Sequence, residues 1–261
     1  MNKNTPISPS TMVGRGGYDY IQQGDCLELM KQMSNKSVDV VFTSPPYNDT
    51  GTHNQDVAIV DESGCTHKKY LHVENRKDWY EWMCECIDEM RRVAKKYVLF
   101  NIQGIKNNRE NLYKLIGHYA KYIHDIVIWY KPNGLPTSTP HKLSNTYEYL
   151  LIIKCDGTKG VDVNSTFYRN VIVKNNNSNK EYAKIHRAVM SQDFCDEVIK
   201  EFTQEGDVVL DPFCGLATTC VSCVKQNRFY VGFEISEEYC QAAQARISKL
   251  KLNNIIESEK I

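Results

Sequence analysis

Long apolar runs and an excess of charge of one sign are both missing from this 261-residue sequence. No apolar stretch approaches the roughly 20 residues that a transmembrane helix needs, so we expect no membrane partner. The 32 lysines and arginines balance 32 aspartates and glutamates, so composition alone does not indicate a polyanionic ligand. Residues 1–17 lack the basic start and apolar segment of a secretory signal, and we interpret them as the flexible tail of a cytoplasmic protein.

The ten cysteines are not arranged as a disulfide framework. Several of them, such as Cys86 and Cys220, fall inside apolar segments, which is typical of buried free thiols in a reducing compartment. Cys84 and Cys86 point to different faces of a predicted helix, and only Cys65 and His67 could complete a zinc site with them. We therefore predict no metal site.

Short apolar runs alternate with longer segments of helical periodicity. The predicted strands are Tyr18–Gln22, Val38–Thr43, Tyr97–Ile102, Ile126–Tyr130, Tyr147–Ile153, Val208–Leu210 and Phe229–Phe233. The predicted helices are Leu27–Met33, Asp78–Lys95, Lys106–Tyr119, Asp193–Phe202, Thr218–Lys225 and Glu237–Leu250. This alternation predicts an α/β fold with a doubly wound, mainly parallel sheet, whose ligands bind at the carboxyl ends of the strands.

Two polar segments interrupt the alternation, at about 49–76 and 154–182. Irregular segments of this length in a compact domain are usually functional loops or disordered. The sequence has no internal repeat and no sign of a second domain. We therefore expect a single catalytic domain over residues 18–261, with these two segments as insertions that face its substrate.

A strand, a tight turn and a helix are predicted over Val208–Thr219. Asp211 ends the strand, and Gly215 lets the backbone approach a ligand closely. Glu234 ends the next strand, where a carboxylate is well placed to bind two ribose hydroxyls. The sequence lacks a G-x-G-x-x-G fingerprint, which argues against NAD or FAD.

The tetrapeptide Ser44-Pro45-Pro46-Tyr47 follows a predicted buried strand. Its two prolines fix φ at successive positions and make the loop rigid. Tyr47 offers a flat face on which a flipped base could stack, and Ser44 and the Pro45 carbonyl could accept hydrogen bonds from an exocyclic amine. Such acceptors favour the geometry in which the nitrogen lone pair is available, so the loop suits methyl transfer to an aromatic amine.

Together these motifs resemble those of the amino-methylating DNA methyltransferases of bacteria, phages and some viruses. The order resembles their permuted group, in which the catalytic motif precedes the cofactor motif. Ser44–Asn48 resembles the catalytic motif and Asp211–Gly215 the cofactor loop, and the resemblance runs over about residues 18–250. It implies a Rossmann-like sheet of seven strands with one antiparallel, S-adenosylmethionine as cofactor and double-stranded DNA as substrate.

The resemblance also implies roles for individual residues. Gly24-Asp25 resembles the contact to the cofactor adenine, and Lys184–Ala188 resembles the segment that touches the methionine moiety. The residues expected to bind the cofactor are Asp25, Lys184, His186, Asp211, Pro212, Phe213, Gly215, Thr218 and Glu234. The stretch near the target base is matched by Lys131–Asn133, Pro136, Ser138 and Asn145–Glu148. The expected catalytic residues are Ser44, Pro45, Pro46 and Tyr47, and the expected substrate-binding residues are Asn48, Lys131, Asn133 and Ser138.

The chain departs from the family pattern in two places. Leu216-Ala217 stand where a second glycine is common in the cofactor loop. The segment Lys184–Phe194 lacks the proline usual after the histidine and the one usual at its end. Both departures concern contacts to the cofactor and leave the catalytic loop intact.

Ser44 bears on the choice of target base. Relatives that act on the N4 of cytosine tend to carry Ser at this position, and those that act on the N6 of adenine tend to carry Asp. The sequence therefore favours cytosine, with adenine open because Asn48 is common among the adenine enzymes.

Other functions and partners stay open. RNA and protein-glutamine methyltransferases use similar loops but usually place the cofactor loop first. A DNA-binding module with a decayed site is disfavoured by the intact Ser44, Asp211 and Glu234. The resemblance implies a variable recognition region at Lys154–Tyr182, which is short and leaves room for a homodimer whose partners share the recognition. A cognate restriction nuclease is an open partner.

Overall fold

The computed structural model describes residues 17–47, 59–60, 66–67, 78–104, 108–134, 141, 143–176 and 189–258. The N-terminal tail up to residue 16 and most of the segment 49–76 lie outside these ranges. So do four of the predicted site residues, Asn48, Ser138, Lys184 and His186.

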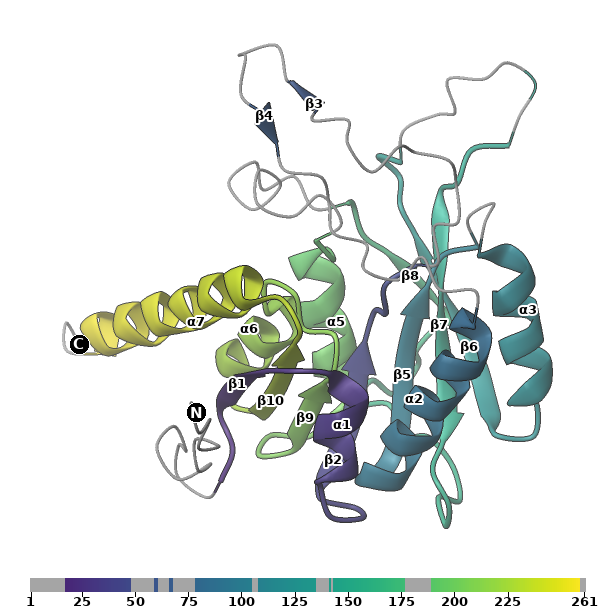
Figure 1. Cartoon of the computed structure of the whole chain (residues 1–261), viewed down its shortest axis with the longest axis horizontal. Coiled ribbons are helices and arrows are strands. Elements are labelled where there is room, and N and C mark those ends of the chain that lie inside the picture. The colour runs from purple at the N-terminus through teal and green to yellow at the C-terminus, as the bar shows by residue number, and fades with distance from the viewer. Residues whose placement is uncertain are drawn as a thin grey trace, which may run out of the picture.

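One sheet with the strand order β1-β10-β9-β2-β5-β7-β6-β8 forms the centre of the molecule (Figure 1). Its strands are β1 (Tyr20–Gln23), β2 (Val38–Thr43), β5 (Ala94–Ile102), β6 (Ile123–Tyr130), β7 (Tyr147–Lys154), β8 (Val171–Val173), β9 (Val208–Asp211) and β10 (Phe229–Glu234). Neighbours run parallel except at β7, which is antiparallel to β5 and β6. A separate antiparallel pair consists of β3 (Ile59–Val60) and β4 (Thr66–His67).

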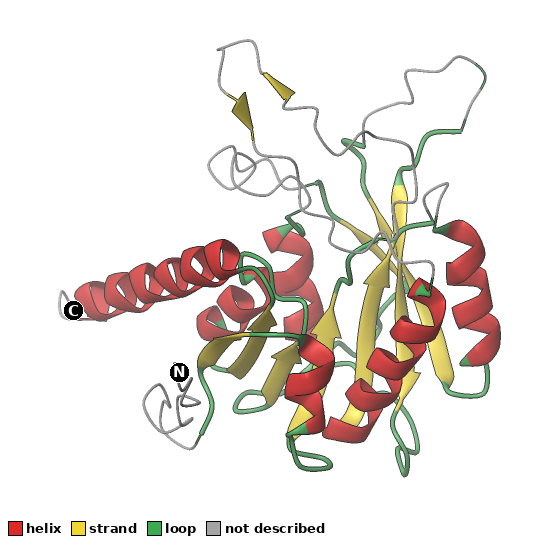
Figure 2. Cartoon of the chain, viewed as in Figure 1, coloured by secondary structure: helices red, strands yellow, loops and turns green. Residues whose placement is uncertain are grey.

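Helices cover both faces of the sheet (Figure 2). One face carries α1 (Cys26–Lys31), α2 (Trp79–Val93) and α3 (Arg109–His118), and the other carries α5 (Gln192–Phe202), α6 (Thr218–Lys225) and α7 (Glu237–Ser258). This is the three-layer doubly wound arrangement that the alternating pattern predicted. Because both faces are covered, the central strands β2 and β9 are almost wholly buried.

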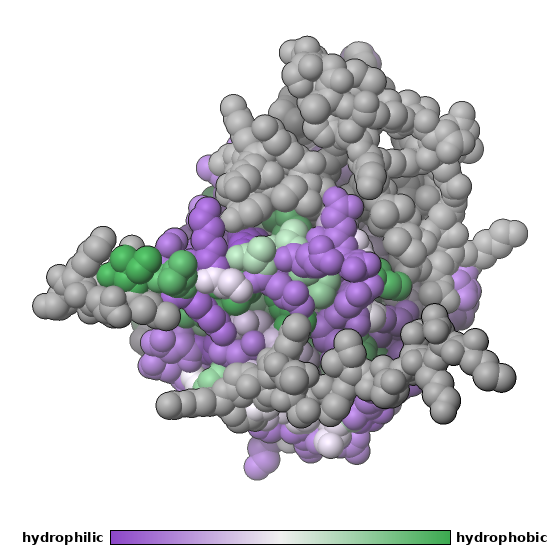
Figure 3. Space-filling view, turned by 60° about the vertical axis from the view of Figure 1, so that its left-hand side comes forward, coloured by the Kyte–Doolittle hydropathy of each residue, from purple (hydrophilic) through white to green (hydrophobic). Residues whose placement is uncertain are grey.

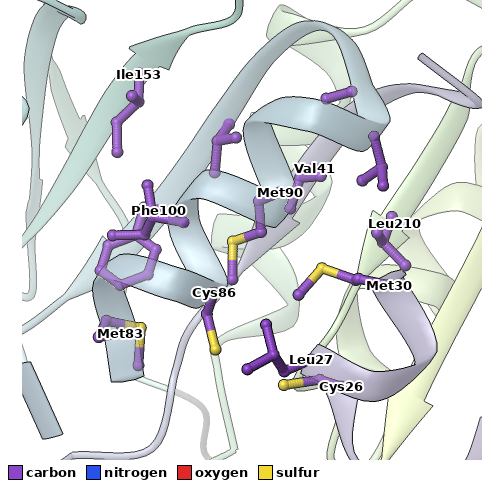
Figure 4. Packing of buried hydrophobic residues seen from close by; sticks show 14 of the residues in the cluster. Cys26, Leu27, Met30, Val41, Met83, Cys86, Met90, Phe100, Ile153 and Leu210 are labelled. Atoms are coloured by element: carbon purple, nitrogen blue, oxygen red, sulfur yellow. The ribbon is translucent and has the colours of Figure 1, made fainter. Parts of the chain in front are cut away.

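The core between α1, α2 and the sheet is rich in sulfur-containing side chains (Figure 4). Met30 from α1 and Met83, Cys86 and Met90 from α2 are each fully buried there. Flexible thioethers fill irregular gaps between helices that cross a twisted sheet. The nine cysteines in the described part of the chain are all free thiols, which agrees with the prediction from their apolar surroundings. No metal-binding cluster is found among the described residues.

Two differences from the sequence-based prediction have clear causes. The predicted helix Asp78–Lys95 ends at Val93, because Ala94 pairs with Val38 and already belongs to β5. No glycine or proline separates the two elements, so periodicity could not locate the boundary. The sheet has eight strands where seven were predicted, since the short β8 within the polar segment 154–182 pairs with the outer side of β6.

The surface shown in Figure 3 is mostly hydrophilic over its described part. One apolar patch on it lies toward the end of α7, where Leu252 and Ile256 are exposed. Among the described residues, no helix is long and apolar enough to cross a membrane.

The strands β2 and β9 lie side by side at the centre of the sheet. From β2 the chain continues outward to β5, and from β9 it continues to β10 on the opposite side. Such a reversal of direction leaves a crevice at the carboxyl ends of the strands, where doubly wound sheets bind their ligands. Both predicted motifs begin at this crevice, because the loop Ser44–Tyr47 follows β2 and the loop 212–217 follows β9.

Candidate active site

A cavity of roughly 430 Å³ lies at the carboxyl ends of the strands. The catalytic loop contributes four lining residues, Ser44, Pro45, Pro46 and Tyr47. The predicted cofactor residues that line it are Asp25, Asp211, Pro212, Phe213, Gly215, Thr218 and Glu234. The fold thus brings together every described residue predicted for catalysis or for cofactor binding. Lys131 and Asn133 are not among the residues that line the cavity.

Asp211 ties the two motifs together. The Thr43 hydroxyl, at the end of β2, donates a hydrogen bond of 2.6 Å to Asp211 Oδ1, and the Phe213 amide donates another of 3.2 Å. Asp211 is 2% exposed, and this burial raises its pKa to about 6 despite the two hydrogen bonds. Its carboxylate is therefore held in place in a site that disfavours its charge.

Glu234 organises the loop that follows β9. Its two carboxylate oxygens accept hydrogen bonds from the amides of Gly215 and Ser236, each at 2.9 Å. Burial raises the pKa of Glu234 as well. The amide of Gly24 donates to the Glu234 carbonyl at 2.9 Å, which joins the end of β1 to the end of β10. These bonds fix the turn around Gly215, where φ is +49°.

Asp25 caps the helix that follows β1. Its Oδ1 accepts hydrogen bonds from the amides of Leu27 and Glu28 at 2.9 and 3.0 Å. Gly24 has φ of +153°, and a Cβ there would meet a Leu29 methyl at 3.0 Å, so glycine suits the turn. Asp25 is therefore a cap in the free protein and also lines the cavity.

Ala217 explains one departure from the family pattern. It stands before α6 with φ of 61° and ψ of 37°, in the left-handed region. A second glycine is common at this place because glycine adopts that conformation without a steric penalty. In this chain the alanine methyl is fully buried in the core beside α6, which offsets part of the cost. The chain therefore adopts the left-handed conformation at this position with an alanine in place of a glycine.

The lining of the cavity is acidic. Asp25, Asp211 and Glu234 form a row at the ends of β1, β9 and β10, which we call the acidic row. Glu148 is a fourth carboxylate, and no lysine or arginine is found among the described residues that line the cavity. The expected cofactor carries a cationic sulfonium and a cationic amine, so this charge fits it. A nucleoside phosphate would be repelled.

Trp79 anchors the catalytic loop, a role that sequence reasoning missed. Its indole Nε1 donates a hydrogen bond of 3.1 Å to the Pro46 carbonyl, and the ring is fully buried at the start of α2. The pattern of α2 had identified this residue only as part of an apolar face. A buried indole needs an acceptor, and that requirement was the available signal. The next turn adds Trp82, which packs edge-on against Phe213 at 5.8 Å between ring centroids.

Trp79→Phe should loosen the loop while leaving the core filled. We expect turnover to fall about tenfold, since small misplacements of reacting groups are costly. The free energy of unfolding should fall by about 1–2 kcal/mol. Tyr119→Phe is the matched control. The buried Tyr119 hydroxyl donates a hydrogen bond of 2.9 Å to the Cys84 carbonyl, and neither residue lines the cavity. Equal turnover in Trp79→Phe and wild type, measured by single-turnover methylation, would contradict the anchoring role.

Lys131 and Asn133 contact residues that line the cavity without lining it themselves. Lys131 is 5% exposed, and its Nζ forms an ion pair of 2.9 Å with Glu148 Oε1. Asn133 Oδ1 accepts a hydrogen bond of 2.7 Å from the amide of Asn176, a residue that lines the cavity. In the free protein both residues hold lining residues in place, and direct contact with a substrate stays a prediction.

Asn101 completes the group around Glu148. Its Nδ2 donates a hydrogen bond of 2.6 Å to Glu148 Oε2, and both residues line the cavity. Sequence reasoning placed Asn101 inside an apolar strand and gave it no role. A polar residue near the carboxyl end of a buried strand was the signal, as it was for Asp211.

Known protein sequences resemble the chain over most of its length. The family model N6_N4_Mtase, described as DNA methylase, matches residues 38–245. Type II methyltransferase M.HinfI of Haemophilus influenzae is 26% identical over 258 residues, which cover 89% of this chain and 69% of that protein. Type II beta methyltransferase M.BslI of Bacillus sp. (strain NEB-606) is 27% identical over 280 residues. That match covers 92% of this chain but only 29% of M.BslI, so the chain spans less than a third of this relative.

Solved structures share the fold. PvuII DNA methyltransferase (cytosine-N4-specific) matches with a TM-score of 0.66 and 18% identity over 86% of this chain and 84% of the other. M1.HpyAVI in complex with SAM matches with a TM-score of 0.62 and 21% identity over 87% of this chain and 98% of the other. At these identities the likeness concerns the fold, which confirms the predicted methyltransferase architecture.

Proposed function

Because the chain belongs to the N6_N4_Mtase family of DNA methylases, we propose that it methylates the exocyclic N4 of cytosine in DNA. The observation that carries the proposal is that the Ser44–Tyr47 loop and the acidic row open onto one cavity. The loop suits an aromatic amine, and the acidic row suits a cationic methyl donor. RNA and protein-glutamine substrates are disfavoured by the family match.

The acidic row and the loop after β9 form the site for S-adenosylmethionine. Asp25, Asp211, Pro212, Phe213, Gly215, Thr218 and Glu234 are the described residues that we assign to it. The cofactor supplies a methyl group on a positively charged sulfur, which becomes a neutral thioether when the methyl leaves. Glu234 has its carboxylate already oriented by two amides, so it can accept hydrogen bonds from sugar hydroxyls without rearranging. Asp211 contributes a fixed negative charge.

The catalytic loop positions the amine. The Trp79 indole donates to the Pro46 carbonyl and so fixes the loop, and we assign Ser44 and the Pro45 carbonyl as the acceptors for the amine. Bonds to these two acceptors hold the amine hydrogens and turn the nitrogen lone pair out of conjugation with the ring. Tyr47 offers its face for stacking of the flipped base. Positioning of this kind accounts for a large share of the rate in transfer reactions.

Ser44 supports cytosine as the target base. Among relatives, a serine before Pro-Pro accompanies cytosine enzymes more often than adenine enzymes. Adenine N6 is the second candidate, favoured by Asn48, which lies outside the described residues. Both bases present the same kind of amine, so the loop chemistry applies to either. The short recognition segment at 154–182 also motivates a homodimer as a proposal, and a cognate restriction nuclease stays an open partner.

Nucleoside mass spectrometry tests the base. DNA from cells that express the protein should contain N4-methylcytosine, and DNA from cells that express Ser44→Ala/Tyr47→Ala should not. N6-methyladenine without N4-methylcytosine would contradict the cytosine assignment and leave the family activity intact. Sequencing of the modified DNA then returns the recognition sequence.

A further inference from the structure

Glu148 stands apart from the other carboxylates of the cavity. The strand order places the acidic row, on β1, β10 and β9, to one side of the catalytic loop that follows β2. Glu148 lies on β7, which is on the other side, beyond β5. The catalytic loop therefore lies between the proposed methyl donor and this fourth carboxylate.

Two buried donors fix the Glu148 carboxylate. Lys131 Nζ binds Oε1 at 2.9 Å, and Asn101 Nδ2 donates to Oε2 at 2.6 Å. Asn101 adjoins the catalytic loop, because Phe100 pairs with Thr43, the residue before Ser44. Glu148 is thus hydrogen-bonded directly to Asn101, the strand residue that adjoins the loop. Each of its oxygens keeps a lone pair for a further donor.

This arrangement has an energetic cost. With Nδ2 turned to Glu148, Asn101 Oδ1 is buried without a partner in the described structure. An unsatisfied buried acceptor of this kind destabilises a fold and calls for an explanation. The Lys131–Glu148 pair is also buried, with the two side chains 6% and 11% exposed. Buried ion pairs of this kind are weak sources of stability, so a role in function is the better reason for them.

The reaction creates a need for such a group. When the amine nitrogen gives its lone pair to the methyl carbon, the nitrogen gains positive charge. Its two hydrogens then point away from the methyl donor. Ser44 is neutral and cannot offset that charge. A preorganised carboxylate on the far side of the nitrogen can do so.

We propose that Glu148 is a catalytic residue of the methyl transfer. Its carboxylate shares one hydrogen of the flipped base's exocyclic amine with Ser44 in a bifurcated hydrogen bond, while the Pro45 carbonyl holds the other hydrogen. The Glu148 carboxylate also receives the proton that the nitrogen loses as the nitrogen–carbon bond forms and the carbon–sulfur bond breaks. Asn101 and Lys131 are positioning residues for it. This inference rests on the proposed function and extends it to a residue outside the catalytic motif.

The first test measures the single-turnover rate. Glu148→Gln alone would leave Lys131 buried and unpaired, so the principal variant is Lys131→Met/Glu148→Gln. We expect its methylation rate to fall about 100-fold, while its affinity for S-adenosylmethionine stays within twofold of wild type. The matched control is Glu201→Gln, since Glu201 is another buried carboxylate and is not among the residues lining the cavity. Its rate should be unchanged.

The second test separates contact with the amine from a structural role. Duplexes carrying the recognition sequence are made with the target cytosine or with 2-pyrimidinone, which lacks the exocyclic amine. Binding of each is measured in the presence of S-adenosylhomocysteine. Loss of the amine should weaken binding about tenfold more for wild type than for the variant, because only wild type loses a charged hydrogen bond. Glu148→Gln alone, as a second variant, should behave like the double variant.

The outcomes separate the two proposals. Equal loss of affinity in wild type and in both variants would overturn the catalytic role of Glu148, and so would a wild-type rate in both variants. If the product is N6-methyladenine, only the cytosine assignment fails, and the same cycle is run with purine in place of adenine. A wild-type protein that methylates no base in DNA would overturn the proposed function and the role of Glu148 with it.

Discussion

Asp211→Asn should make the free protein more stable at pH 8, although the substitution lies in the proposed active site. Asp211 is almost completely buried, and its pKa is raised from 3.8 to about 6. The asparagine keeps an oxygen that can accept the hydrogen bonds from Thr43 and Phe213. It removes the charge that burial disfavours. The free energy of unfolding of the variant should therefore exceed that of wild type by the cost of burying the charged carboxylate.

The sign of the pH dependence follows from proton binding. Between pH 3.8 and about 6 the native Asp211 holds a proton that the unfolded chain has released, so wild-type stability falls as pH rises through this window. Below the window both states are protonated and the variant has no advantage. Above it the advantage is complete, and it amounts to at most about 3 kcal/mol.

Urea unfolding of the ligand-free protein at pH 4 and pH 8 measures this difference. Cofactor affinity should move the other way, falling at least tenfold in Asp211→Asn because the cationic ligand loses a fixed negative charge. Wild-type affinity should likewise weaken below pH 6. A variant that is less stable than wild type at pH 8, or that binds the cofactor equally well, would contradict the assignment. Functional sites commonly contain groups that destabilise the free protein and strengthen the binding of its ligand.

The sequence was a good guide to the fold wherever burial follows a clear period. All seven predicted strands and six predicted helices have a counterpart, and the antiparallel strand expected from the family is β7. The short β8 was missed because Val171–Val173 lies in a polar segment and joins the sheet only through pairing with β6. The end of α2 was misplaced because tertiary pairing of Ala94 decides it. Local propensity carries neither kind of information.

Part of the candidate site could also be predicted from the sequence, because its residues follow buried strands that the sequence reveals. Ser44–Tyr47, Asp211 and Glu234 could be found because each follows a buried strand, and the topology then places them at one crevice. The partners of buried polar groups could not be found in the same way. Trp79 and Asn101 are separated from Pro46 and Glu148 by tens of residues, and only the packed structure shows that they meet.

Lys131→Met should be among the most destabilising single substitutions in the chain. Removing one partner from a buried ion pair leaves the other charge uncompensated, at a cost of about 3–5 kcal/mol. Among the described residues, the Glu148 side chain would then keep only its bond from Asn101. Lys131→Met/Glu148→Gln should regain most of the loss, since no charge is left behind. Lys174→Met is the control, because its pair with Glu197 is half-exposed and separated by 3.6 Å, and it should cost less than about 1 kcal/mol.

The same variants decide what Lys131 does. A lysine that contacts DNA phosphate would lower the affinity for DNA and reduce its salt dependence when replaced, with little effect on stability. The buried pair predicts a large loss of stability with little change in the affinity for DNA or in its salt dependence. The reason is that the Lys131 ammonium is bound to Glu148 and its side chain is only 6% exposed. Urea unfolding and DNA binding at two salt concentrations distinguish these cases. A loss of stability below about 1 kcal/mol together with a reduced salt dependence would show that Lys131 serves the nucleic acid rather than Glu148.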